Sequence, residues 1–580
     1  MQNPTFITLK KNAKQDMTAL KEYKLTILGD CSTQHLATAL KGYGYQEGYN
    51  LNLFDSDYNQ IDAQIMDDTS ELYKHQPEAV LLYMSTEKLY ENFCETAPEQ
   101  RENFADLTMQ KINNYWQTLN SKIKTNLLQF NFIEIDDRTF GNYANKTPSS
   151  FIYQLRKLNF ALMELVSQTK NAFLIDLSTI QNTYGRQVVH DDKLYYIAKM
   201  PLSTNILPEV SKQVLDVIKA LNGKFKKCAI LDLDNTLWGG VIGDDGLKSI
   251  QIGELGLGHA FSEFQMWLKD LKNRGIILAV CSKNNENIAK EPFEKHPDMI
   301  LKLDDISMFV ANWEDKATNI KYIQETINIG MDSIVFIDDN PFERNLVKGM
   351  IPDITVPELP EDPALYLSYL KSLNLFETAS YSENDKDRTK QYQAEVGRST
   401  MQSNFENFDD YLKSLEMVAT AHPFEEFEFP RISQLTQRSN QFNLRTIRYT
   451  EAEIEQIANN DQYLTLSFSL KDKFGDYGLI SVVIMEKQDE KTIFLNTWLM
   501  SCRVLKRGME EFIINQVIET AKENGFSKVT SEYIPTPKNA MVEKMYAKLG
   551  FADLGNGKFE ANVDDFEFNK TNIKQKREQK

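Results

Sequence analysis

Short runs of consecutive apolar residues, separated by longer stretches with helical periodicity, recur along much of the chain. A run that is apolar at nearly every position is typical of a parallel strand buried on both faces, and the stretches between such runs predict crossover helices. In the first segment, to about residue 222, we expect strands at Lys24–Leu28, Ala79–Met84, Phe132–Ile135 and Ala172–Leu177, with helices at about 103–128 and 150–169.

The second segment repeats this pattern between about residues 225 and 360. The apolar runs predict strands at Cys228–Leu231, Ile276–Cys281 and Ser333–Ile337, with helices near 258–273, 315–327 and 341–349. Residues 239–253 carry closely spaced glycines, which favour a β-hairpin flap.

The pattern changes in the last third of the chain. Strands expected at Gln462–Leu470, Tyr477–Met485 and Thr492–Met500, then a helix at 508–523, indicate an antiparallel α+β unit. A polar stretch at about 378–402 predicts a linker or an exposed helix, and the basic end predicts a disordered tail. The sequence therefore predicts a multidomain α/β protein divided into domains at 1–222, 223–377 and 403–568, a linker at 378–402 and a tail at 569–580.

Composition narrows the function classes. The 580 residues are too many for one core, and a net charge of −18 argues against nucleic acid as a partner. The five cysteines are scattered without metal-ligand spacing, which is typical of reduced thiols. Since we find neither a signal peptide nor an apolar run long enough to span a bilayer, we expect a cytoplasmic protein.

Carboxylates gather where the strands of the second segment end. Asp232 and Asp234 follow one buried strand, and Asp338 and Asp339 follow another. Open α/β sheets bind ligands at the carboxyl ends of their strands, and unpaired acids there favour a cation. Asp232, Asp338, Asp339 and Asp234, the last through its main-chain carbonyl, are therefore expected to hold Mg²⁺.

Further residues in this segment supply the other requirements of phosphoryl transfer. Asp232 is expected to attack phosphorus and form an aspartyl-phosphate, and Asp234 to protonate the leaving oxygen and then activate water. Ser282, at a strand end, can donate a hydrogen bond to phosphate, and Lys316, at a helix start, can hold positive charge beside it.

These four elements, in this order, resemble the haloacid-dehalogenase-like (HAD) phosphohydrolases. The strings Leu-Asp-Leu-Asp-Asn-Thr-Leu-Trp-Gly-Gly-Val-Ile-Gly-Asp-Asp-Gly and Phe-Ile-Asp-Asp-Asn-Pro-Phe-Glu-Arg are similar to the FkbH-like branch. The resemblance implies a Rossmann-like domain and a Mg²⁺-dependent phosphatase. Only 49 residues separate Asp232 from Ser282 and 33 separate Ser282 from Lys316, so no large cap domain is expected.

A turn in the third segment, Arg503-Val-Leu-Lys-Arg-Gly508, resembles the pyrophosphate loop of GNAT acyltransferases. Its exposed amides would cradle coenzyme A, although Lys506 stands where that family has its first glycine. The same resemblance implies a late helix containing Asn539 and Tyr546, with Tyr546 as general acid. The alternative is a degenerate domain that binds a partner, in which Tyr546 packs in the core; Cys502 is expected to be a buried thiol.

The first segment carries a turn, Gly29-Asp-Cys-Ser, that resembles the nucleophile turn of SGNH hydrolases. Cys31 stands at the nucleophile position, where a thiolate at a helix N-terminus would suit thioester chemistry. His190 could act as its base, with Asp191 or Asp192 behind it. No Gly-x-Asn motif follows Ala79–Met84, and the alternative is that Cys31 is a small buried residue in a tight turn.

Three functions follow from these patterns. The FkbH-like resemblance implies a phosphorylated acyl donor, 1,3-bisphosphoglycerate, and delivery of a glyceryl group to the phosphopantetheine arm of an acyl carrier protein. The second hypothesis is a phosphatase for a free small-molecule phosphate, with the outer domains as specificity or docking modules. The third is a carrier-docking scaffold with vestigial sites.

Overall fold

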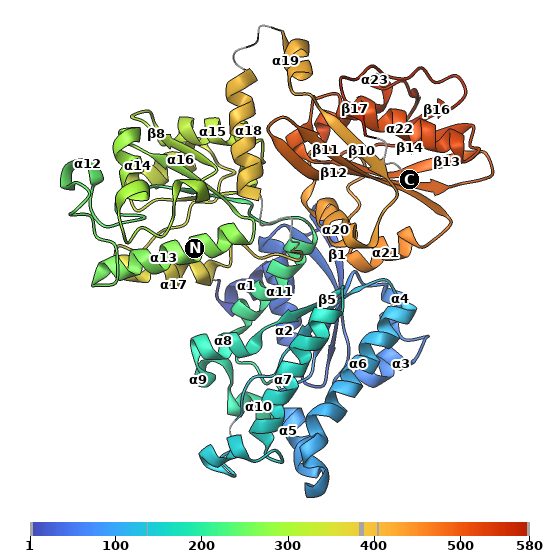
Figure 1. The fold of residues 1–580 in the computed structure, drawn as a ribbon. Helices are drawn as coiled ribbons and strands as arrows, with labels where there is room; N and C mark the ends of the chain where they lie inside the picture. Colours follow the sequence, from blue (N-terminus) through green and yellow to red (C-terminus); the bar gives the residue numbers. More distant parts are fainter. Residues whose placement is uncertain (1–3, 136, 382–387, 403–404, 406, 577–580) are drawn as a thin grey trace. The chain divides into compact units, whose positions relative to one another are not determined.

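A computed structural model describes residues 4–135, 137–381, 388–402, 405 and 407–576. It divides into two compact units, Gln2–Ile218 and Lys219–Lys580, and each is treated by itself below. Figure 1 shows the elements of both units. Among the described residues, no helix combines the length and the apolar character needed to cross a membrane.

The first unit is built on a five-stranded parallel sheet with strand order β2-β1-β3-β4-β5. Its strands are β1 Lys21–Gly29, β2 Tyr49–Asp55, β3 Ala79–Tyr83, β4 Asn126–Phe130 and β5 Ala172–Ile175. Its helices are α1 Phe6–Asn12, α2 Gln34–Gln46, α3 Ile61–Met66, α4 Glu71–His75, α5 Thr86–Glu95, α6 Phe104–Lys122, α7 Phe151–Gln168, α8 Leu177–Tyr184, α9 Arg186–Val189, α10 Asp192–Ala198 and the start of α11 Leu207–Leu221.

One predicted strand in this unit is wrong. Phe132–Ile135 is a loop that follows β4, although the side chains of Phe132 and Ile133 are buried in the core. The amide of Asn159 hydrogen-bonds both backbone groups of Phe132, at 2.9 Å to its N and 2.8 Å to its O. Because a side chain takes the place of a neighbouring strand, an apolar run forms a buried loop here.

The second unit begins with a four-stranded parallel sheet of order β8-β7-β6-β9. Its strands are β6 Cys228–Leu231, β7 Ile277–Ser282, β8 Met308–Ala311 and β9 Ile334–Ile337. Alternate residues of β6 belong to different cores: Ala229 and Leu231 pack with α13, α14 and α17, and Cys228 and Ile230 pack with α15, α16 and α18. The run is apolar throughout because helices cover both faces (Figure 1). These helices are α12 Ile242–Asp245, α13 Leu257–Asn273, α14 Glu286–Lys295, α15 Lys316–Ile327, α16 Pro341–Met350, α17 Tyr366–Leu373 and α18 Arg388–Gln402.

The flap at 239–253 differs from the predicted hairpin. A single antiparallel bridge joins Gly239 to Gln251, and the residues between them include the short helix α12. The carboxylate of Asp245 accepts the backbone N–H of Val241 at 2.7 Å, which closes this turn locally and removes a donor that a hairpin would need. No large cap domain interrupts 232–316.

The rest of the second unit contains a mixed eight-stranded sheet of order β15-β16-β14-β13-β12-β11-β10-β17. Helices α20 and α21 cover one face and α22 covers the other. The strands are β10 Val418–His422, β11 Tyr463–Asp472, β12 Gly475–Lys487, β13 Thr492–Met500, β14 Lys528–Glu532, β15 Ala552–Gly555, β16 Lys558–Asn562 and β17 Lys574–Gln575. The helices are α19 Phe408–Ser414, α20 Phe429–Arg438, α21 Glu451–Ala458, α22 Met509–Glu523 and α23 Met545–Lys548. The predicted multidomain α/β fold is confirmed.

Two polar segments are more ordered than their composition indicates. The predicted linker contains α18, in which Arg398 is buried and forms a two-point ion pair with Asp472 at 2.7 and 2.8 Å. The predicted disordered tail includes β17, which pairs with β10, and the buried Ile573. Residues 382–387 of the linker and 577–580 of the tail lie outside the described residues. The exact domain boundaries stay predictions.

Candidate active site

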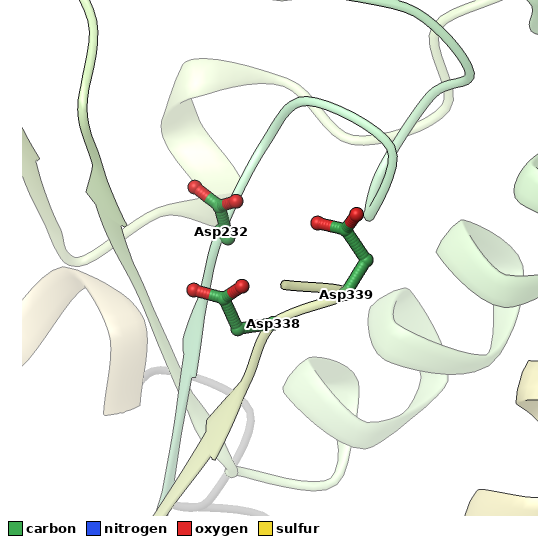
Figure 2. A group of neighbouring side chains, drawn as sticks. All are labelled: Asp232, Asp338 and Asp339. Atoms are coloured by element: carbon green, nitrogen blue, oxygen red, sulfur yellow. The ribbon is translucent and has the colours of Figure 1, made fainter. Parts of the chain in front are cut away.

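Two neighbouring parallel strands bring the predicted carboxylates together. Leu231 of β6 is in register with Ile337 of β9, so the residues that follow, Asp232 and Asp338, lie at the same edge of the sheet. Asp339 comes next, and the three carboxylates face one another (Figure 2). One oxygen from each lies within 4.8 Å of the others, an arrangement suited to a single cation.

Burial and mutual repulsion make it unfavourable for all three carboxylates to be ionised at once. Burial first, and the charge of Asp232 second, raise the pKa of Asp338 to about 7 and raise the pKa of Asp339. The ammonium of Lys316 lies 3.0 Å from Oδ1 of Asp232 and 2.6 Å from Oδ2 of Asp338. One lysine against three carboxylates leaves negative charge in excess, so the donor set fits a hard divalent cation such as Mg²⁺.

Asp234 occupies a different position from the other acids. Its Oδ1 accepts hydrogen bonds from Nε1 of Trp238 at 3.0 Å and from the N–H of Ile242 at 2.9 Å. Its Oδ2 accepts one from Nδ2 of Asn284 at 3.0 Å, and burial raises its pKa. The carboxylate is thus held by Trp238, the flap residue Ile242 and Asn284, outside the cation cluster, in a setting that lets it carry a proton. Its expected main-chain contact with Mg²⁺ stays a prediction.

The other two predicted residues also lie at this edge. Ser282 is the buried last residue of β7, and Lys316 is the first residue of α15, which Asp315 caps through the N–H of Thr318 at 2.9 Å. The four elements predicted from the sequence therefore begin or end at one edge of one sheet.

Three supporting residues were not predicted from the sequence. Trp238 and Asn284 hold Asp234, and Nη1 of Arg344 donates to the main-chain oxygens of Asp338 at 2.9 Å and Asp339 at 2.5 Å. The motif strings contain Trp238 and Arg344, and Asn284 follows Ser282 by two positions. Proximity to the motif was the only available signal.

Comparisons with known proteins place this chain in a family. A model of the FkbH N-terminal domain matches residues 24–219. The chain is 51% identical in sequence to the N-terminal part of the protein BF1531 from Bacteroides fragilis. The crystal structure of that protein contains a phosphatase domain and is complexed with Mg. The match covers 65% of this chain and 100% of that one, with a TM-score of 0.63. The chain belongs to the FkbH-like family.

Acetyltransferase structures also match part of this FkbH-like chain, at low identity. The ribosomal-protein-S18-alanine N-acetyltransferase from Escherichia coli matches at 15% identity over 25% of this chain and 89% of that one, with a TM-score of 0.20. A spermidine N-acetyltransferase from Vibrio cholerae, in complex with CoA and spermine, matches at 13% identity over 25% and 96%, with a TM-score of 0.21. A comparison with curated protein sequences finds no match.

In the first unit of this FkbH-like chain, Cys31 follows β1 and is buried. Burial and the nearby carboxylates of Asp30, Glu87 and Asp55 raise the pKa of its thiol well above the ordinary value. Negative neighbours disfavour a second negative charge, so this setting opposes the thiolate that the sequence led us to expect.

His190 has acidic partners on two sides. Its Nε2 lies 3.1 Å from Oδ1 of Asp192 and its Nδ1 lies 3.2 Å from Oε1 of Glu87 and 2.7 Å from the main-chain oxygen of Pro201. Asp191 instead caps α10 by accepting the N–H of Leu194 at 3.0 Å. Of the two expected aspartates, Asp192 is therefore the one beside the imidazole.

The predicted pyrophosphate loop is closed by the chain's own side chains. The carboxylate of Glu510, which is buried, accepts the N–H of Lys506 at 2.9 Å. Lys506 has φ 60° and Gly508 has φ 83°, so the lysine adopts a conformation that favours glycine. A pyrophosphate on these amides would have to displace a carboxylate.

The other two predicted acyl-transfer residues are structural in their contacts. Asn539 is fully buried, and its amide bonds the N–H of Thr536 at 2.7 Å and the main-chain oxygens of Asn443 and Ile534 at 2.9 and 3.0 Å. Tyr546 is 1% exposed among aromatic rings, and burial raises its pKa. Its position matches the alternative in which it packs in the core.

Proposed function

We propose that this FkbH-like chain is a Mg²⁺-dependent phosphohydrolase that forms an aspartyl-phosphate on Asp232. The observation that carries the proposal is the buried carboxylate cluster at the ends of β6 and β9, with Lys316 bound to two of its members. The 51% identical relative contains a phosphatase domain complexed with Mg, which supports the same activity here.

In the first step, an oxygen of Asp232 attacks phosphorus and the bond from phosphorus to the leaving oxygen breaks. Asp234, protonated as its raised pKa favours, gives its proton to that oxygen. In the second step, water attacks the phosphorus, the bond to Asp232 breaks, and Asp234 takes up the proton of the water. The same carboxyl thus acts first as acid and then as base.

The remaining residues hold and neutralise the phosphate. Lys316 provides a fixed positive charge beside Asp232, and Ser282 can donate its hydroxyl to a phosphate oxygen. Asp232, Asp338 and Asp339, with the main-chain oxygen of Asp234, would hold Mg²⁺. When bound, the ion supplies positive charge against the transferring phosphoryl group.

Hydrolysis of p-nitrophenyl phosphate tests the proposal. We expect Mg²⁺-dependent activity that falls by at least about a thousandfold in Asp232→Asn, because the nucleophile is lost. The matched control is Asp270→Asn, the same substitution at an exposed position on α13, which should leave activity unchanged. Mg²⁺-dependent activity that survives in Asp232→Asn would exclude Asp232 as nucleophile.

A second variant isolates the second step. Acetyl phosphate has a good leaving group and needs no acid, so Asp234→Asn should still form the aspartyl-phosphate but hydrolyse it slowly. Peptide mass spectrometry should then find the phosphoryl group on the peptide that contains Asp232. If the modification is on another residue, the assignment of the nucleophile is wrong.

We further infer that phosphate removal is coupled to acyl transfer onto an acyl carrier protein, with the phosphopantetheine arm as acceptor. The match of residues 24–219 to the FkbH N-terminal domain supports this coupling. Mass spectrometry of a carrier protein incubated with the chain and 1,3-bisphosphoglycerate tests it, and a mass increase of one glyceryl group is expected. Phosphate release without any change of the carrier would favour the alternative, a stand-alone phosphatase.

A further inference from the structure

A cavity of about 490 Å³ lies within the unit Lys219–Lys580, away from the carboxylate cluster. Residues from the start of β6, the turn before β9, α18, α20 and the end of β13 line it. Lys227 precedes β6 and Asp232 follows it. At the rise of an extended strand these two positions are about 16 Å apart, so the cavity is a separate site.

The residues that line the cavity carry a net positive charge, whereas the whole chain carries a net negative charge. Six basic residues line it, Lys227, Arg388, Arg431, Arg438, Arg503 and Lys538, against two acidic ones, Asp332 and Asp353. The whole sequence has 83 acidic and 65 basic residues. Asp332 is already ion-paired with Lys538. Basic residues are therefore enriched around this cavity, although the protein as a whole is acidic.

Lys227 is held there by neutral groups. Its ammonium donates to the main-chain oxygen of Arg438 at 2.7 Å and lies 5.7 Å from the ring centre of Phe225. Burial lowers the pKa of Lys227 to about 8, and the guanidinium groups of Arg438 and Arg388 act in the same direction, against the opposing effect of the Asp332 carboxylate. A cation among cations is destabilised, and an anion would relieve that repulsion.

Arg503, just after β13, also lines the cavity. It is 5% exposed and donates to the amide oxygen of Gln391, to Oγ of Ser501 at 3.3 Å and to the main-chain oxygen of Tyr477 at 3.3 Å. All three acceptors are neutral. Burying a charge without a counter-charge is unfavourable, so an anion bound in the cavity would stabilise Arg503.

We propose that this cavity binds a small organic anion, a phosphoryl or phosphonyl group on an apolar body. The anionic group faces Lys227 and Arg503, and the body packs against apolar lining residues such as Ile329, Phe442 and Met500. The proposal does not depend on the proposed phosphatase activity.

Isothermal titration with phenylphosphonate, which a phosphatase cannot hydrolyse, tests the site. The full chain is titrated in EDTA so that the carboxylate cluster holds no cation, and Asp232→Asn is titrated beside it. Both should bind phenylphosphonate equally, and the neutral analogue benzyl alcohol should bind at least about tenfold more weakly. Loss of binding in Asp232→Asn, or equal binding of benzyl alcohol, would overturn the proposal.

Substitutions separate binding from folding. Lys227→Met and Arg503→Met should each weaken phenylphosphonate binding at least about tenfold, whereas Lys321→Met, at an exposed position on α15, should not. Lys227→Met should keep or raise the unfolding temperature of the ligand-free chain, because it removes a half-buried charge that lies close to the guanidinium groups of Arg438 and Arg388. Lys227→Arg, which keeps the charge, should bind better than Lys227→Met. Equal loss in both Lys227 variants, or wild-type binding in Lys227→Met, contradicts the proposed role.

Discussion

Lys316 is the residue whose removal tests the electrostatics of the carboxylate cluster most directly. Its ammonium lies 3.0 Å from Asp232 and 2.6 Å from Asp338, and its side chain is almost fully buried. Lys316→Met keeps the length and apolar stem of the side chain but removes its charge. The substitution leaves three acids at one sheet edge with no cation between them.

The free-energy cost of removing the Lys316 charge can be estimated from these distances. At an effective dielectric constant of about 20, each contact of Lys316 contributes about 5–6 kcal/mol of Coulomb energy. Part of that energy is offset because the lysine no longer has to be desolvated, and breaking a buried ion pair typically costs about 3–5 kcal/mol net. We expect a local destabilisation of about that size at neutral pH without Mg²⁺.

Hydrogen–deuterium exchange of peptides that contain β6 and β9 measures this local stability. In Lys316→Met, exchange of these peptides should accelerate about a hundredfold or more without Mg²⁺. Saturating Mg²⁺ should restore part of the protection, because it returns positive charge to the cluster. The matched control is Lys295→Met, which breaks an exposed pair with Glu291 on α14 and should change exchange little.

The pH dependence gives a second, independent check. Because burial and Asp232 raise the pKa of Asp338 to about 7, the folded chain binds more protons than the unfolded one between pH 4 and 7. Metal-free stability contributed by this group therefore falls as pH rises through that window. The loss of local stability in Lys316→Met should be smaller at pH 6 than at pH 8, since carboxyl groups of the cluster can become protonated at the lower pH. Equal exchange in Lys316→Met and Lys295→Met, at either pH, would refute this account of the cluster.

Three further predictions concern single groups. Mg²⁺ affinity measured by titration calorimetry should be about tenfold weaker at pH 6 than at pH 8, because the Asp338 carboxyl must lose its proton to bind the ion; affinity independent of pH would contradict this. Iodoacetamide at pH 7.5 should modify the exposed Cys94 well before Cys31, as peptide mass spectrometry can show, and faster reaction at Cys31 would restore it as a nucleophile. Tyr546→Phe should leave the unfolding temperature and any acyl transfer nearly unchanged, whereas Tyr546→Ala should destabilise the chain by about 3–5 kcal/mol; loss of transfer in the phenylalanine variant would make Tyr546 catalytic.

Much of the sheet edge that carries the carboxylate cluster could be predicted, because its determinants are local in sequence. A strand covered by helices on both faces must be apolar throughout, so the end of Cys228–Leu231 is marked by the first charged residue, Asp232. The same holds for Ile334–Ile337 and Asp338. Parallel strands in one sheet then bring these ends together without any further information.

Features that depend on distant side chains could not be predicted in this way. The apolar run Phe132–Ile135 is a loop only because Asn159 replaces a strand partner. The amides of the turn before α22 are occupied only because Glu510 folds back onto Lys506. The sequence shows that such donors and acceptors exist, but their pairing is decided by tertiary packing.

The net charge of the chain also says little about an individual site, because it does not show where the charged residues lie. A charge of −18 argues against binding to a polyanion, since the field far from the protein is the sum of all charges. It does not argue against binding one phosphate, since the field inside a buried site is set by the few groups that face it. At one end of β6 the acids Asp232 and Asp338 require a cation, and at the other end Lys227 lies among arginines and favours an anion. The two ends of a single buried strand therefore select ligands of opposite sign, and neither selection can be read from composition.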